Sequence, residues 1–214
     1  MDQQSHTKYS QDLAHEYVRR TAVEIIIKLN VVIFFLWYLI GFRLPLFMID
    51  NFLVSWTGLT EGRVWTLLTS VFSHNLLWHL FMNMFVLYSF GPALERILGF
   101  AKFFKFYLFA GIFSSFSHTV VCAWLLDRPG LAALGASGAI SAVVILFALI
   151  FPKEKIFIFG LIPVPALGGA LGLSALDLWG LISQTRGYDL PIGYGAHLGG
   201  VLFGAVYYFF RKKL

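Results

Sequence analysis

Apolar residues dominate this chain in six long runs that are separated by shorter polar stretches. The runs cover residues 23–42, 75–90, 103–125, 134–151, 156–182 and 192–210. About 20 consecutive apolar residues cross the hydrocarbon core of a bilayer as a helix, and each run is close to that length. The pattern therefore predicts an all-α membrane protein built as a bundle of six transmembrane helices.

Two polar stretches have a distinct character. Residues 1–22 mix acids and bases, which predicts a short cytoplasmic arm rather than a signal or transit peptide, and residues 23–214 then form one six-helix membrane domain. The connection 43–74 carries Trp56 and Trp65 among its charged residues. Tryptophan prefers the headgroup level, so we predict a long first loop that lies in the membrane interface.

Composition and charge placement narrow the class of protein. The chain is 58% apolar and 13% charged, against about 25% charged in soluble domains. A soluble enzyme or a nucleic-acid-binding module is excluded, and the lipid bilayer is the expected surrounding. Twelve of the 16 lysines and arginines fall on one side of the six predicted spans. The positive-inside rule then predicts that both termini face the cytoplasm.

Three helices that run in the same direction each carry a polar residue near their start. His79, Ser137 and His197 lie in the second, fourth and sixth runs, all of which run from the outer to the inner side. Polar groups inside a membrane cost free energy and mark functional sites. We expect these three residues to lie at a similar depth below the outer surface.

Small residues surround the serine and the second histidine. Gly135 and Gly138 flank Ser137, and Gly200 shares a helical face with His197. Small residues let helices approach closely, which would bring the serine hydroxyl within reach of the imidazole. Such a pair is the minimum for an activated nucleophile, in which histidine takes the serine proton and later returns it to the leaving group.

The second run offers hydrogen-bond donors to the same region. His79 and Asn83 are spaced i,i+4 on one helical face, and together with the backbone N–H of Ser137 they suit an oxyanion site. Asp177 is too isolated in the sequence to be assigned as a third member of a triad. His74 and His79 would point about 140° apart on a helix, which argues against a shared metal ion. We predict neither a metal nor a cofactor.

Several short motifs resemble one known family. They are His74, His79-Leu80-Phe81-Met82-Asn83, Glu95-Arg96-Ile97-Leu98-Gly99, Gly135-Ala136-Ser137-Gly138 and Ala196-His197-Leu198-Gly199-Gly200. In order, spacing and host segment they are similar to the rhomboid intramembrane serine proteases, and most similar to the presenilin-associated rhomboid-like branch. The resemblance covers about two-thirds of the chain.

The resemblance implies roles for these residues. Ser137 would be the nucleophile and His197 the general base of a dyad without a catalytic aspartate. His79 and Asn83 would line the oxyanion hole, and His74 would organise the first loop. The substrates of such an enzyme would be transmembrane segments of other membrane proteins.

The chain departs from the family pattern in three places. Thr66 follows Trp65 where rhomboids often have arginine, and Ser141 stands where many bacterial members have an aromatic residue against the histidine. The extra helix and targeting region of the presenilin-associated branch are not evident, which favours a bacterial cytoplasmic (inner) membrane. The fifth run contains prolines and glycines that weaken a helix, among them Pro163, Pro165, Gly168, Gly169 and Gly172. We therefore expect this helix to bend and to admit substrate laterally between helices two and five.

Two other functions remain open from the sequence. A catalytically inactive rhomboid-like protein would bind and chaperone transmembrane clients, although such proteins usually lack the serine or the histidine. A small transporter would carry charged groups deep in several helices and matching breaks in its two halves. The pattern predicts neither an oligomeric state nor a particular substrate.

Overall fold

The computed structural model describes residues 21–158, 162–188 and 191–211, and nearly all of the predicted N-terminal arm lies outside this range. Six helices of 14 or more residues form the described bundle: α2 (Ala22–Leu39), α6 (Leu77–Leu98), α7 (Phe100–Trp124), α8 (Ser137–Ile150), α9 (Ala166–Thr185) and α10 (Tyr194–Arg211). The connection 43–74 contains α3 (Pro45–Phe52), α4 (Trp56–Thr60), α5 (Thr66–Thr69) and the 3-10 helix η1 (Ser70–Phe72).

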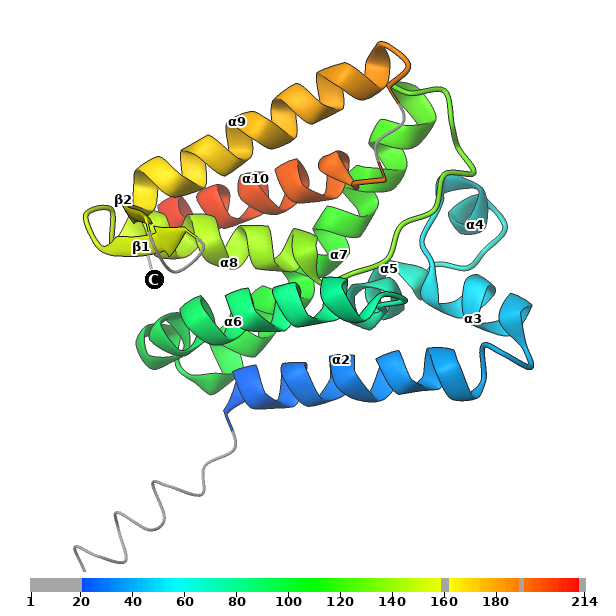
Figure 1. Ribbon diagram of the computed structural model, residues 1–214, viewed down its shortest axis with the longest axis horizontal. Helices are drawn as coiled ribbons and strands as arrows, with labels where there is room; N and C mark the ends of the chain where they lie inside the picture. The colour runs from blue at the N-terminus through cyan, green and yellow to red at the C-terminus, as the bar shows by residue number, and fades with distance from the viewer. Residues whose placement is uncertain (1–20, 159–161, 189–190, 212–214) are drawn as a thin grey trace, which may run out of the picture.

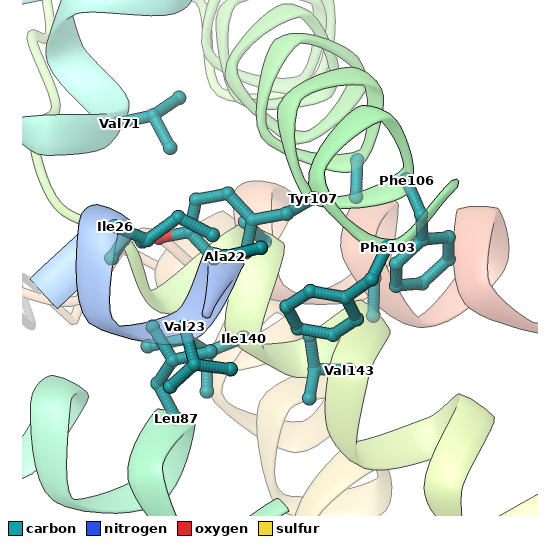
Figure 2. Packing of buried hydrophobic residues seen from close by; sticks show 14 of the residues in the cluster. Ala22, Val23, Ile26, Val71, Leu87, Phe103, Phe106, Tyr107, Ile140 and Val143 are labelled. Carbon is teal, nitrogen blue, oxygen red and sulfur yellow. The ribbon is translucent and has the colours of Figure 1, made fainter. Parts of the chain in front are cut away.

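The long helices lie side by side, with α2 on one flank of the bundle and α9 on the other (Figure 1). Helices α6, α8 and α10 lie between them, and α7 crosses behind. Figure 2 shows the core, to which α2, η1, α6, α7 and α8 all contribute buried side chains: Ala22, Val23, Ile26, Val71, Leu87, Phe103, Phe106, Tyr107, Ile140 and Val143. Burying this apolar surface against neighbouring helices fixes α6 and α8, the two helices that carry His79 and Ser137.

The second and fourth helices differ from their predicted boundaries, and a glycine with positive φ marks each observed boundary. The second helix does not stop near residue 90 but continues through Pro92 to Leu98, where Gly99 ends it with φ of +78°. The fourth helix begins at Ser137 rather than at residue 134, because Gly135 has φ of +125°, a conformation that other residues rarely adopt. Ser137 is therefore the first residue of α8.

The fifth run is not one bent helix. Strands β1 (Lys155–Ile158) and β2 (Ile162–Pro165) form an antiparallel hairpin, and α9 begins only at Ala166. Pro163 and Pro165 lie in β2, where proline is compatible with an extended edge strand but would break a helix interior. The prolines thus precede α9, and the prediction that they bend it is wrong, whereas the glycines at 168, 169 and 172 lie within the helix.

Four described helices are long and apolar enough to cross a membrane, namely α2, α6, α7 and α9. Helix α8 is apolar but shorter, with 14 residues. Length and composition therefore support four of the six predicted spans, and the chain is a predominantly helical membrane protein.

Glycines bring α8 and α10 into close contact. A Cβ on Gly200 would overlap the carbonyl oxygen of Gly138, and a Cβ on Gly204 would lie 2.5 Å from the carbonyl oxygen of Ala142. Backbones can approach this closely only where side chains are absent. The contact places the first turn of α8 beside the first two turns of α10, which brings Ser137 and His197 together.

The start of α2 is capped by a side chain from α6. The two carboxylate oxygens of Glu95 accept hydrogen bonds from the backbone N–H groups of Ala22 (2.7 Å) and Val23 (3.1 Å). These N–H groups have no partner within the helix, and a negative charge at a helix N-terminus is favourable. Glu95 thus ties α2 to α6.

We expect Glu95→Gln to lower the free energy of unfolding by about 1.5–3 kcal/mol. The amide has no charge and only one acceptor oxygen, so one of the two hydrogen bonds to α2 is lost. Thermal unfolding in detergent measures this effect. The matched control is Glu24→Gln, which removes the same charge from the first turn of α2. Glu24 and its partner Lys28 are exposed, so we expect a change below about 0.5 kcal/mol. Equal effects of the two variants would contradict the capping role.

Candidate active site

The hydroxyl of Ser137 and the imidazole of His197 form a direct hydrogen bond. Ser137 Oγ lies 2.9 Å from His197 Nε2. The serine comes from the first residue of α8 and the histidine from the first turn of α10. The His197 side chain is 20% exposed, so the pair is sheltered but still accessible from the neighbouring cavity.

Asp177 completes a hydrogen-bonded row on the other side of the imidazole. Its Oδ1 lies 2.9 Å from His197 Nδ1, and its side chain is 18% exposed. A carboxylate only accepts hydrogen bonds, so Nδ1 carries the proton and Nε2 is left to accept from the Ser137 hydroxyl. This is the tautomer that a general base requires.

The structure therefore corrects the prediction that Asp177 is isolated. The sequence did contain a signal, because an acid within a lipid-exposed helix needs a partner. The identity of that partner depends on which face α9 turns toward α10. The spacing of residues within one helix does not reveal this. Ser141 occupies the position where an aromatic residue would pack against the histidine. Here the hydrogen bond to Asp177 holds the orientation of His197 instead. Ser141 donates to the carbonyl oxygen of Ser137.

His79, Asn83, Ser137 and His197 line one cavity of about 800 Å³. The ring of His79 lies over Gly135, where a Cβ would come within 2.7 Å of the His79 Cε1 atom. The N–H of Ser137, at the start of α8, has no acceptor within the helix. A backbone donor and His79 thus share the cavity with the serine hydroxyl.

Asn83 is held by two hydrogen bonds within the protein. Its amide Nδ2 donates to His74 Nε2 (3.1 Å) and to the carbonyl oxygen of His79 (3.0 Å). Both amide hydrogens are therefore used, and Asn83 would donate to a bound oxyanion only after giving up one of these bonds. His74, fully buried just before α6, is the residue that fixes the amide.

The first loop is anchored without the arginine that often follows tryptophan. Thr66 donates to the carbonyl oxygen of Arg63. Arg63 forms ion pairs with Glu61 (2.6 Å) and Asp50 (3.3 Å). Ser73, next to His74, accepts a hydrogen bond from the Trp37 indole (2.6 Å), which ties the loop to α2.

His74 gives the protein a pH-dependent stability. Burial, and to a lesser extent the neighbouring His79, lower the pKa of His74 from 6.5 to about 3. Between pH 6.5 and pH 3 the unfolded chain binds a proton that the folded chain excludes. The free energy of unfolding therefore falls as the pH is lowered through this window, by up to about 1.4 kcal/mol per pH unit.

We expect wild type to lose about 2 kcal/mol of stability from this group between pH 7 and pH 5. His74→Gln keeps an acceptor for Asn83 but cannot titrate, so its pH dependence should be shallower. Thermal unfolding of both proteins at pH 7 and pH 5 measures the difference. Parallel pH profiles for the two proteins would contradict this assignment.

A helical membrane bundle that aligns a hydroxyl, an imidazole and a carboxylate has the geometry of a serine hydrolase site. The sequence comparisons agree with this class, because a model of the Rhomboid domain matches residues 61–213. The chain belongs to the rhomboid family and lies close to its presenilin-associated branch.

Three relatives illustrate this relationship. Rhomboid protein 1, mitochondrial, of Saccharomyces cerevisiae is 34% identical over 91% of this chain and 54% of its own length. RHOMBOID-like protein 12, mitochondrial, of Arabidopsis thaliana is 31% identical over 75% of this chain and 50% of its own. The presenilin-associated rhomboid-like protein, mitochondrial, of Rattus norvegicus is 38% identical over 69% and 38%. The chain thus spans about half, or less, of these relatives.

These names overturn the predicted bacterial inner membrane, and with it the prediction that both termini face the cytoplasm. All three relatives are mitochondrial proteins. The prediction rested on two features of the presenilin-associated branch, an extra helix and a targeting region, that are not evident in this sequence. Such an absence is weaker evidence of location than the relatives themselves.

Proposed function

We propose that this protein is an intramembrane serine endopeptidase that cleaves transmembrane segments of other membrane proteins. The observation that carries the proposal is the row Ser137–His197–Asp177, with both hydrogen bonds at 2.9 Å, inside a bundle of apolar helices. Membership of a family that generally consists of serine intramembrane proteases supports the same activity.

The first half of the reaction forms an acyl-enzyme. Ser137 Oγ attacks the scissile carbonyl carbon while His197 Nε2 takes the hydroxyl proton, and Asp177 stabilises the resulting imidazolium. The tetrahedral intermediate then collapses, the C–N bond breaks, and Nε2 returns the proton to the leaving amine. In the second half, water attacks the ester with His197 again acting as base, and Ser137 is regenerated.

Charge on the substrate oxygen needs donors in the same cavity. The N–H of Ser137 is one donor, and the side chain of His79 is the second. Asn83 is the third, and it exchanges its bond to His74 or to the carbonyl oxygen of His79 for one to the oxyanion. Removing a single oxyanion donor typically costs about 10²–10³ in turnover, so these residues contribute less than the nucleophile itself.

The proposed membrane arrangement has six spans, with α8 and α10 completing the four that length and composition support. The start of α2 and the end of α10 then lie on one side, and Ser137 lies near the opposite surface, where water has access. By analogy with the three relatives, the proposed location is a mitochondrial membrane.

Lateral access between α6 and α9 is supported by a groove of about 430 Å³ that runs beside Ser137. Val86 of α6 and Leu173 of α9 both line it. Cross-linking cysteines at these two positions should block cleavage of a transmembrane substrate yet leave labelling of Ser137 by a small fluorophosphonate intact. Each single-cysteine variant treated with the same reagent is the control. Undiminished cleavage by the cross-linked protein would contradict lateral access.

Reconstituted protein and a model transmembrane substrate test the function. Wild type should release two fragments, and His197→Ala should release none at a matched protein concentration. Cleavage that persists in His197→Ala would refute the mechanism. A wild type that binds several substrates without cleaving any would favour the inactive, client-binding alternative, although the intact bond between Ser137 and His197 speaks against it.

A further inference from the structure

Helix α9, which carries Asp177, has few fully buried residues. Its buried positions are Ala166, Gly169 and Ala170 at the start and Gly180 further along. Several large side chains between and beyond them are exposed: Leu171, Leu173, Leu176, Leu178, Trp179 and Ile182. Figure 1 shows α9 on the outer flank of the bundle. Gly180, one helical turn from Asp177, is the buried position of α9 that lies nearest to it in the sequence.

Gly180 receives the aromatic ring of Tyr194 directly against the backbone of α9. A Cβ at Gly180 would overlap the Cζ and Cε1 atoms of that ring and would lie 2.7 Å from Cε2. Tyr194 is itself only 7% exposed. An added methyl group would therefore have to displace this ring or push α9 and α10 apart.

The contact between Tyr194 and Gly180 lies next to the hydrogen bond between His197 and Asp177. Tyr194 precedes His197 by three residues in α10, and Asp177 precedes Gly180 by three residues in α9. Three residues correspond to a rise of about 4.5 Å along a helix. The Tyr194–Gly180 contact and the His197–Asp177 bond are thus neighbouring links between the same two helices, less than one turn apart.

We propose that Gly180 is a positioning residue, whose missing side chain lets Tyr194 set the spacing at which Asp177 reaches His197. The inference rests on the proposed function, because it assigns the Asp177–His197 bond a part in catalysis. Gly180 does not touch the reacting atoms. It acts through Asp177, and a change there alters how the general base is held rather than how substrate binds.

Gly180→Ala tests the inference in the whole 214-residue chain. A displacement of about 1 Å can cost about 100-fold in rate, so we expect kcat on a transmembrane substrate to fall by about 10- to 100-fold with little change in KM. The low-field proton NMR signal of His197 Nδ1–H, which reports its bond to Asp177, should weaken or vanish. Gly172→Ala is the matched control, because a Cβ there meets nothing within 4 Å and both readouts should stay at wild-type level.

A second variant separates spacing from misfolding. Tyr194→Leu combined with Gly180→Ala removes the ring that the methyl group would strike, so it should recover part of the lost kcat and of the low-field signal. Gly180→Ala with wild-type kcat and signal would overturn the inference. Reduced kcat with an undiminished signal, or a double variant no better than Gly180→Ala in both readouts, would also overturn it. If wild type itself does not cleave, the proposed function fails, while the NMR comparison still tests the contact.

Discussion

Replacing Ser137 by alanine should abolish proteolysis while leaving the fold intact. The variant removes the hydroxyl that lies 2.9 Å from His197 Nε2, and no covalent acyl-enzyme can then form at this position. Loss of the nucleophile in a serine hydrolase costs about 10⁴-fold or more. Initial rates on a reconstituted transmembrane substrate measure the loss, and thermal unfolding shows that the protein is folded.

The chain provides a matched control for this variant in the next turn of α8. The hydroxyl of Ser141 donates to the carbonyl oxygen of Ser137 and not to an imidazole. A hydroxyl bonded back to its own helix contributes little to stability, and Ser141→Ala should keep a rate within about twofold of wild type. If Ser141→Ala were the inactive variant and Ser137→Ala remained active, the nucleophile would be misassigned.

Replacing Asp177 by asparagine should lower kcat by about 10²- to 10⁴-fold. The amide can present its N–H₂ group to His197 Nδ1, which would move the imidazole proton to Nε2. A protonated Nε2 cannot accept the serine proton, so turnover falls although the geometry is preserved. Cleavage rates at saturating substrate measure this effect, because substrate binding should change little.

Ser183→Ala is the control for Asp177→Asn, and it should keep a wild-type kcat. Ser183 lies on the same helix, six residues after Asp177, outside the groove. Its hydroxyl donates to the carbonyl oxygen of Trp179 rather than to His197. A wild-type kcat in Asp177→Asn would indicate that Ser137 and His197 work as a dyad, with another group holding the imidazole.

The approach of Ser137 to His197 could be anticipated from the sequence for a simple physical reason. Helices that run in the same direction place residues near their starts at one depth, and glycine at positions 138 and 200 lets two backbones touch. Both facts follow from spacing and residue type. The membrane class followed similarly from the apolar runs and the low charge.

Other features depended on contacts that spacing does not encode. Asp177 faces His197 because of the rotation of α9, which is set by packing at Gly180 and at the start of the helix. Apolar content alone does not distinguish a strand from a helix, so it could not predict the hairpin before α9. It also could not predict that α6 continues through Pro92. The two hydrogen bonds that the Asn83 amide donates could not be predicted, because one of them depends on the position of His74 in the loop before α6.

The central claim is that Ser137 is a nucleophile activated by His197, and covalent labelling tests it most directly. A fluorophosphonate reacts with an activated serine, forming an O–P bond and releasing fluoride, and peptide mass spectrometry locates the adduct. We predict one adduct, on Ser137, in wild type and a strong reduction in His197→Ala. An adduct on another residue, or none in a preparation that cleaves its substrate, would contradict the account.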